Sequence, residues 1–400
     1  MVNGGLAFAV PGLITGLELG SALGLEQSIY VFLLGGLILS ILGVVTGLVG
    51  MHSRLASCMT MKFVFGKQGA NVLSFAFVVA LFGWYGVNID LFSSVTQRLL
   101  LDGFNISSQI WMLEIIFGVV VTLTTILGFK LLDKLSSLFV PVMFLLVVYM
   151  VYQSIHYDQT INDVATSAIS FSFGEAISIV VGSFIVSVVL MPDFTRFSEN
   201  KTATAISSFL PYLGLSTFVY IASAFAGLAV MESDILKVML ALGLGWFAFA
   251  LLILSSWVTN VVNLYSSALG LSAINSKWQE WKVIVAAGLL GTVVATFNLL
   301  DNFTDFLFGL SIIFVPVAAI YVTDFFILRN QKPYQIKELE SLDNVNVSAL
   351  IAWFIGMAVT VFVNKGYITL TTIEVCDAIL VTTPVYYFLS KRIKRENNVN

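Results

Sequence analysis

The chain has 400 residues, of which 58% are hydrophobic and only 10% are charged, and its formal net charge is −4. Soluble domains carry about 25% charged residues, so this composition excludes a soluble enzyme, a nucleic-acid-binding protein and a disordered chain. Long apolar runs recur from one end to the other, which indicates a polytopic α-helical protein whose main partner is the lipid bilayer.

Twelve apolar runs are long enough to cross a membrane, which takes about 20 residues per helix. In chain order they lie near 4–24, 28–50, 70–97, 109–129, 135–155, 169–191, 204–230, 240–270, 283–299, 304–328, 347–364 and 368–390.

Basic residues are unequally distributed over the loops between these runs. If the even-to-odd connections and the C-terminus face the cytoplasm, every Lys and Arg except Arg98, Lys237 and Lys365 lies on the cytoplasmic side. Cytoplasmic loops of membrane proteins concentrate Lys and Arg. The asymmetry therefore supports twelve crossings, with both termini in the cytoplasm.

Glycine and proline interrupt the first and sixth runs. The first contains Gly4, Gly5, Pro11, Gly12 and Gly16, and the sixth contains Gly182-Ser183 with Pro192 at its end. Transporters built from inverted repeats hold substrate at mid-membrane between interrupted helices, and spans one and six are equivalent elements of a five-plus-five repeat. The alternative is that these glycines only let helices pack closely.

The third run places Trp84 between Gly83 and Gly86, although Trp favours the membrane interfaces. A flat ligand could stack on the indole in the space beside the glycines, or the ring could simply fill the core. Further along, Asp90 is either an intramembrane carboxylate, which would be a functional candidate, or lies near the outer end of the helix.

Polar side chains form a stripe in the eighth run. Ser256, Asn260, Asn263 and Ser267 share one helical face, and Ser255 and Thr259 lie beside it. Such groups need partners inside a membrane, either on neighbouring helices or in a ligand held in a wet cavity. An asparagine amide both donates and accepts hydrogen bonds, which suits a nucleobase-like solute.

At the inner end of the sixth run, Asp193 and Arg196 are three residues apart, so an ion pair with a structural or gating role is expected. Catalytic and metal-binding motifs are not found, and both histidines, His52 and His156, fall in loops. We therefore expect a transporter without a cofactor rather than an enzyme. A channel is the other class to distinguish, by its lack of saturation.

Several of these segments together resemble the purine/cytosine permease family of nucleobase–cation symporters. They are Gly83-Trp84-Tyr85-Gly86, Gly182-Ser183-Phe184, Asp193-Phe194-Thr195-Arg196-Phe197 and Trp257-Val258-Thr259-Asn260. The resemblance implies an all-α, leucine-transporter-like fold of twelve helices, with helices one and six broken. It also implies a transporter core over 1–330, with repeats at about 1–155 and 169–330, a cytoplasmic loop at 331–346, two peripheral helices over 347–390 and a basic cytoplasmic tail at 391–400.

The same resemblance implies a function and a set of site residues. A monomer in the cell inner membrane would import cytosine or a related purine or pyrimidine by cation symport and alternating access. Trp84 and Phe184 would sandwich the base, and Ser183, Asn260 and the backbone around Gly5 would form hydrogen bonds with it. Sodium would bind the carbonyl groups of Gly5 and Phe8 and the side chains of Ser255 and Thr259.

Three departures from the family pattern leave alternatives open. Leu81 stands where the family has a glutamine that reads the base, and Val258 stands where it has a sodium-binding threonine. Only four residues precede Gly5, where the family has a half-helix. The coupling ion is therefore Na⁺ or H⁺. The substrate could instead be hydroxymethylpyrimidine or another thiamine precursor, allantoin or a hydantoin, and a truncated, non-transporting remnant is a further alternative.

Overall fold

The computed structural model describes residues 9–126, 129–157, 171–274 and 279–397, and all regular secondary structure in this part of the chain is helical. The chain forms two compact units, each of which is described by itself. Unit 1 comprises Met1–Tyr30, Ser74–Ser170 and Leu215–Phe306, and unit 2 comprises Val31–Leu73, Phe171–Gly214 and Leu307–Asn400. Each unit thus draws on both predicted repeats, and the division at 1–155 and 169–330 stays a prediction.

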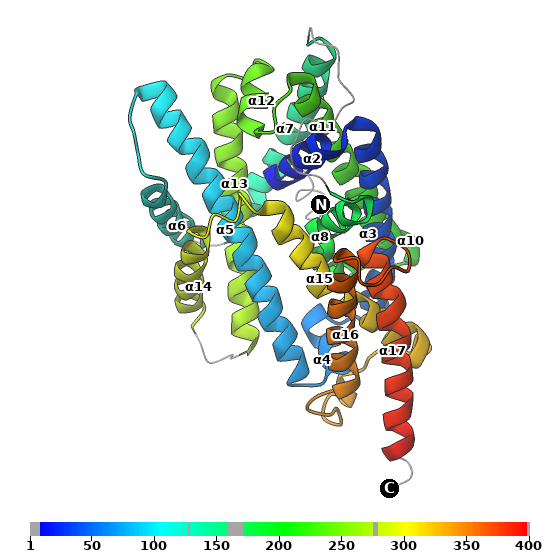
Figure 1. The fold of residues 1–400 in the computed structure, drawn as a ribbon. Helices are drawn as coiled ribbons and strands as arrows, with labels where there is room; N and C mark the ends of the chain where they lie inside the picture. The colour runs from blue at the N-terminus through cyan, green and yellow to red at the C-terminus, as the bar shows by residue number, and fades with distance from the viewer. Residues whose placement is uncertain (1–8, 127–128, 158–170, 275–278, 398–400) are drawn as a thin grey trace. The chain divides into compact units, whose positions relative to one another are not determined.

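Helices occupy all twelve predicted runs (Figure 1). They are α2 (Val10–Leu23), α3 (Leu25–Ser53), α5 (Gly69–Phe104), α6 (Ile110–Ile126), α7 (Phe129–Ile155), α8 (Phe173–Val189), α10–η1–α11 (Lys201–Phe209, Leu210–Ser216, Thr217–Val230), α13 (Trp246–Ile274), α14 (Glu280–Ala295), α15–η2 (Phe303–Val322, Thr323–Leu328), α16 (Val347–Asn364) and α17 (Glu374–Asn397). Short helices in the connections are α4 (Ser57–Phe65), α9 (Met191–Thr195), α12 (Ile235–Ala241) and η3 (Ile336–Glu338). Six of the twelve segments are long and apolar enough to span a bilayer outright, and most of the others are shorter apolar helices.

In unit 1, α2 packs along α11 at very short range. A Cβ atom on Gly16 would lie 2.0 Å from Ser223 Oγ, and one on Gly20 would lie 2.6 Å from Ala224 Cβ. Small residues at such positions let membrane helices approach closely. The helix α13 contacts α6, α7 and α14, and α6 lies beside α14.

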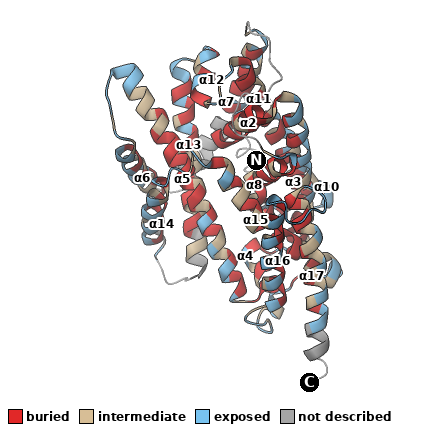
Figure 2. Cartoon of the chain, in the orientation of Figure 1, coloured by how far each residue is buried: buried red, intermediate tan, exposed pale blue. Residues whose placement is uncertain are grey.

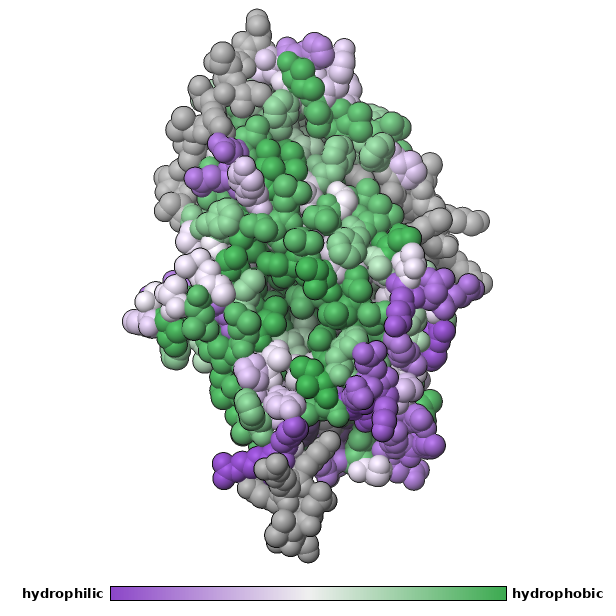
Figure 3. Space-filling model, turned by 90° about the vertical axis from the view of Figure 1, so that its right-hand side faces the viewer, coloured by the Kyte–Doolittle hydropathy of each residue, from purple (hydrophilic) through white to green (hydrophobic). Residues whose placement is uncertain are grey.

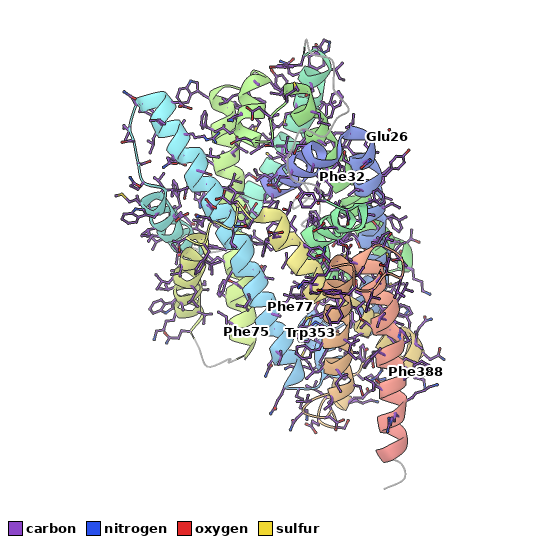
Figure 4. All side chains as sticks on the ribbon, viewed as in Figure 1. Glu26, Phe32, Phe75, Phe77, Trp353 and Phe388 are labelled. Atoms are coloured by element: carbon purple, nitrogen blue, oxygen red, sulfur yellow. The ribbon has the colours of Figure 1, made fainter. Side chains whose placement is uncertain are left out.

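The helices α6 and α14 expose large apolar side chains on one face (Figure 2). On α6 these include Trp111, Ile115 and Val119, and on α14 they include Leu289 and Val293. Exposed apolar residues on this scale would be a liability in water but suit contact with lipid tails. Similarly, Phe75 and Phe77 of α5 are 60% and 7% exposed, so this helix has one outward and one packed side (Figure 4).

In unit 2, α16 and α17 form an antiparallel pair, and α17 also contacts α8 and η2. Trp353 of α16 is buried and donates from its indole Nε1 to the Ile313 carbonyl, whereas Phe388 of α17 is 68% exposed (Figure 4). The face shown in Figure 3 is mostly hydrophobic, with hydrophilic residues gathered toward its edges, as expected for a surface that meets lipid.

The connection at 331–346 is fixed to the rest of unit 2. The Asn346 N–H donates to the Phe65 carbonyl at 2.9 Å, at the end of α4. Nearby, Asp324 accepts hydrogen bonds from the hydroxyl groups of Tyr334 at 2.6 Å and Tyr386 at 2.9 Å. Charged acceptors form the stronger hydrogen bonds, so Asp324 links η2 to both this connection and α17.

The sixth span is not interrupted where the glycine pattern predicted. The helix α8 runs without a break through Gly182-Ser183, ends at Val189, and is followed at Leu190 by the short α9, which carries Pro192 in its first turn. The physical reason lies in packing: a Cβ atom on Gly182 would meet the Leu307 carbonyl oxygen at 1.8 Å. Gly182 therefore admits the α15 backbone rather than breaking the helix. The predicted break of the first span falls in residues 1–8, outside the described residues.

Candidate functional site

Buried polar atoms without partners concentrate in the middle of α13. Ser255, Ser256 and Asn260 are fully buried, and both hydroxyl oxygens, together with the oxygen and nitrogen of the Asn260 amide, have no hydrogen-bond partner among the described residues. Buried polar groups are nearly always paired, so each exception needs an explanation. Four such atoms on adjacent turns of one membrane helix make the middle of α13 the candidate functional site.

The polar stripe predicted on α13 therefore divides into two parts. Ser267 satisfies its hydroxyl within its own helix by donating to the Leu264 carbonyl, so this end of the stripe is structural. The Asn260 amide offers one donor group and one acceptor oxygen, and nothing in the described chain uses either. A ligand that both donates and accepts would match it.

Trp84 of α5 lies half-buried in an aromatic cluster of unit 1. Its ring contacts Phe303 edge-on at 6.0 Å and Phe306 edge-on at 5.4 Å between centroids. Edge-to-face pairs of this kind fix ring orientation. One turn further on, Asn88 donates to the Trp84 carbonyl at 2.8 Å, while its own buried side-chain oxygen has no partner.

The space beside the flanking glycines is filled by protein rather than left for a ligand. A Cβ atom on Gly83 would lie 2.4 Å from the Phe306 ring, and one on Gly86 would lie 3.2 Å from Leu299. Of the two alternatives for these glycines, room for a flat solute or a filled core, the described residues fit the filled core. Their small size instead lets other residues of unit 1 pack against α5, which holds the Trp84 indole in place.

In unit 2, Phe184 of α8 is 9% exposed and packs against Tyr212 at 5.7 Å between ring centroids. Tyr212 lies in η1, a π-helical turn of the seventh span, and its hydroxyl group bonds Ser187 Oγ at 3.0 Å. π-Helical turns are rare and are found frequently at functional sites. The Ser183 hydroxyl donates to the Val180 carbonyl of its own helix at 2.6 Å.

Asp193 and Arg196 do not form the expected ion pair. Asp193 Oδ1 accepts the Ser57 N–H at 2.8 Å, at the N-terminus of α4, and the Arg196 guanidinium lies 4.6 Å from the Phe197 ring centroid. The partly positive end of α4 attracts the carboxylate away from its neighbour. Burial nevertheless raises the pKa of Asp193 above its ordinary range. The role of Asp193 is to cap α4.

Gly5 and Phe8, the predicted backbone ligands for substrate and cation, lie outside the described residues. Of the predicted side-chain ligands for the cation, Ser255 is fully buried with its hydroxyl unpaired, and Thr259 is half-buried one turn further along α13. A buried hydroxyl without a partner is suited to a sodium ligand.

Some residues next to these candidates were not predicted as part of the site. Phe303 and Phe306 hold Trp84, and Tyr212 holds Phe184. They belong to other spans and the sequence gives no pairing signal, so only the folded chain reveals them. Asn88 could have been found, because it is an amide one helical turn from Trp84 in an otherwise apolar segment.

Apolar spanning helices around unpaired polar groups define a polytopic membrane transporter. The chain belongs to the family of permeases for cytosine/purines, uracil, thiamine and allantoin, whose family model matches residues 4–383.

Comparisons with individual proteins agree with this assignment. The chain is 30% identical over 357 residues to the cytosine permease of Escherichia coli strain K12, covering 88% of this chain and 83% of the permease. Its fold is similar to that of Mhp1, in a structure solved in the inward-facing conformation, with a TM-score of 0.83 at 18% identity over 98% of this chain and 90% of Mhp1. A second Mhp1 structure, a nucleobase–cation symport-1 family transporter closed around bromovinylhydantoin, matches with a TM-score of 0.78, also at 18% identity, over 98% of this chain and 91% of Mhp1. The expected all-α, leucine-transporter-like fold is confirmed.

Proposed function

We propose that this chain is a secondary-active permease that imports a nucleobase, cytosine or a related purine or pyrimidine, by symport with a cation. The observation that carries the proposal is the unpaired Asn260 amide in the middle of a membrane-spanning helix. A nucleobase edge presents adjacent donor and acceptor groups, which an amide pairs with directly. Membership of the permease family and the identity to a cytosine permease support the same substrate class.

In this proposal Trp84 and Phe184 each supply an aromatic face to the base, while Ser183, Asn260 and the backbone around Gly5 form hydrogen bonds with it. Stacking of a base on an aromatic side chain contributes about 1–3 kcal/mol, enough to select flat rings over other polar solutes. The contacts of Phe303 and Phe306 with Trp84 keep the indole oriented before substrate arrives, which lowers the cost of binding.

The coupling ion in the proposal is Na⁺ or H⁺. Sodium would bind Ser255 and Thr259 with the Gly5 and Phe8 carbonyl groups. The unpaired Ser255 hydroxyl favours this arrangement, whereas Val258 supplies no oxygen ligand. Cation binding would stabilise the outward-open form and allow the base to be occluded, in the manner of alternating access.

A second candidate substrate is another heterocycle, such as hydroxymethylpyrimidine, allantoin or a hydantoin. Two observations favour it: Leu81 offers no hydrogen bond to the base, and the Mhp1 structure with the same fold was solved with bromovinylhydantoin. Competition of labelled cytosine uptake by a panel of these rings separates the two candidates.

We further propose that the protein is a monomer in the cell inner membrane, with both termini in the cytoplasm. The distribution of Lys and Arg supports this orientation.

The test of the proposed site is binding and uptake of labelled cytosine by wild type and by Trp84→Ala. Loss of the stacking face should weaken binding about tenfold or more, since stacking contributes about 1–3 kcal/mol. Trp111→Ala is the matched control, because Trp111 is 53% exposed on the outward side of α6. Equal binding by wild type and Trp84→Ala would contradict the site.

A further inference from the structure

Two carboxyl groups buried in neighbouring membrane helices of unit 1 have no role in the proposed substrate site. Asp90 of α5 is 5% exposed and Glu114 of α6 is 1% exposed. The ion pairs of the described residues involve neither of them. A buried acid inside a spanning helix is expensive to keep, and such residues usually mark an ion or proton pathway.

The two helices are in direct contact at this level. The rings of Phe92 on α5 and Phe117 on α6 stack with centroids 3.8 Å apart, and the Tyr85 hydroxyl donates to the Gly118 carbonyl at 3.3 Å. Glu114 lies one turn before Gly118, on the packed side of α6. Asp90 and Glu114 therefore lie on two helices in contact, where like charges on both groups would repel each other.

The hydrogen bonds around the pair are incomplete. Asp90 Oδ2 accepts the Leu300 N–H at 3.3 Å, whereas Glu114 Oε1 is buried and has no hydrogen-bond partner among the residues that the structure describes. The nearest basic side chain along α5, Arg98, is already paired with Asp234 at 2.8 Å. With one backbone N–H between them, two buried carboxyl groups are costly to keep ionised together, so this part of unit 1 favours proton uptake.

A route for that proton opens beside Asp90. A cavity of about 420 Å³ is lined by Leu91 and Ser94, which flank Asp90 along α5, and by Leu300, its hydrogen-bond partner. Its other polar lining residues are Glu18, Arg98, Ser233, Asp234 and Asp301. This volume holds many waters, each of which needs about 30 Å³. The lining comes from α2, α5 and α12 and from the connections at 233–234 and 300–301, which the charge distribution places toward the outside of the cell.

We infer that Asp90 and Glu114 form a proton-binding carboxyl pair, loaded from this cavity, whose protonation drives substrate uptake. This inference rests on the proposed function for its coupling role. In the loading step, a hydronium ion in the cavity transfers its proton to a carboxylate oxygen, which forms one O–H bond and leaves water behind. A proton on either group removes one of the two like charges and with it the repulsion between them.

Infrared difference spectroscopy on the purified protein tests proton binding without any transported substrate. The wild type should show a carbonyl stretch from a protonated carboxylic acid that titrates with pH, and Asp90→Asn and Glu114→Gln should each remove or shift it. Asp102→Asn, at the exposed end of the same helix, should leave the band unchanged. Absence of the band in the wild type, or an unaltered band in both variants, overturns the inference.

Transport assays test the coupling. Wild-type uptake should rise as external pH falls, by up to about tenfold per pH unit. Asp90→Asn imitates the protonated form, so it should still exchange internal for external substrate but lose accumulation against a gradient and lose the pH dependence. Exchange activity shows that the variant is folded.

The outcomes separate this inference from the proposed function. If Asp90→Asn and Glu114→Gln both accumulate cytosine with the wild-type pH profile, the two carboxyl groups do not couple protons to uptake. The proposed function as a nucleobase permease would then still stand. If the wild type shows the pH-dependent carbonyl band but transports no heterocycle, the proposed function and the coupling to uptake are both wrong. Proton binding by the two carboxyl groups would still be supported.

Discussion

At the scale of single residues, Asn260 distinguishes a ligand-binding helix from a merely spanning one. Its amide is fully buried and has no hydrogen-bond partner in the part of the chain that the structure describes, although an unsatisfied buried group destabilises the folded state. A chain that keeps such a group gives up stability for function. The sequence identified Asn260, because an amide in an apolar run is conspicuous. It could not show that this amide lacks a partner, since that depends on the neighbouring helices.

Because the Asn260 amide is buried for binding rather than for stability, Asn260→Leu should affect the two properties in opposite directions. Leucine has the same branched shape, with methyl groups in place of the amide oxygen and nitrogen, so relief of the unpaired polar atoms should make the protein more stable by about 1–3 kcal/mol. Binding of cytosine should be lost at the same time. Thermal unfolding in detergent and ligand binding measure the two effects on one preparation.

Asn71→Leu provides the matched control. Asn71 is exposed in the first turn of α5, so the substitution should leave both stability and binding nearly unchanged. A less stable Asn260→Leu that still binds cytosine would contradict the role of this amide.

At the scale of helices, the sequence predicted positions well and contacts poorly. All twelve apolar runs are helical, because hydropathy alone determines where a chain can cross a bilayer. The glycine pair at 182–183 left a helix break and close packing both open, because glycine serves equally for either, and only the folded chain decides for packing. Asp193 contacts Ser57 rather than its neighbour in sequence, Arg196. Glu114 was not predicted as a functional residue, although a single acid in the fourth run is a visible signal.

The packing role of Gly182 leads to a test on α8. Gly182→Ala places a methyl group 1.8 Å from the Leu307 carbonyl oxygen, so the backbone of α8 or α15 must shift. Overpacking of this kind costs about 1–3 kcal/mol. We expect a lower unfolding temperature for Gly182→Ala.

Gly309→Ala is the control for that substitution, because a Cβ atom at Gly309 has no neighbour within 4 Å. This variant should unfold at the wild-type temperature or slightly above it, since alanine is the better helix former. Equal stability of the two variants would show that α8 and α15 do not approach each other as described.

At the scale of the whole molecule, the proposed orientation places α4 in the cytoplasm and the end of α5 outside. Cys58 of α4 is exposed, so a membrane-impermeant thiol reagent should label it only after the membrane is permeabilised. In an Asp102→Cys variant of a Cys58→Ser background, the same reagent should label intact cells. Labelling of Cys58 in intact cells would reverse the topology.

Family membership, fold and charge distribution together describe a membrane permease, and its transport activity is the claim on which the residue roles depend. The most direct measurement is the accumulation of labelled cytosine in liposomes that contain only this purified protein, across an imposed Na⁺ or H⁺ gradient. The account predicts saturable accumulation above the external concentration, lost when the gradient is collapsed and competed by other flat heterocycles. The account would be contradicted if labelled cytosine only equilibrates across the membrane, if its uptake does not saturate, or if no other heterocycle competes with it.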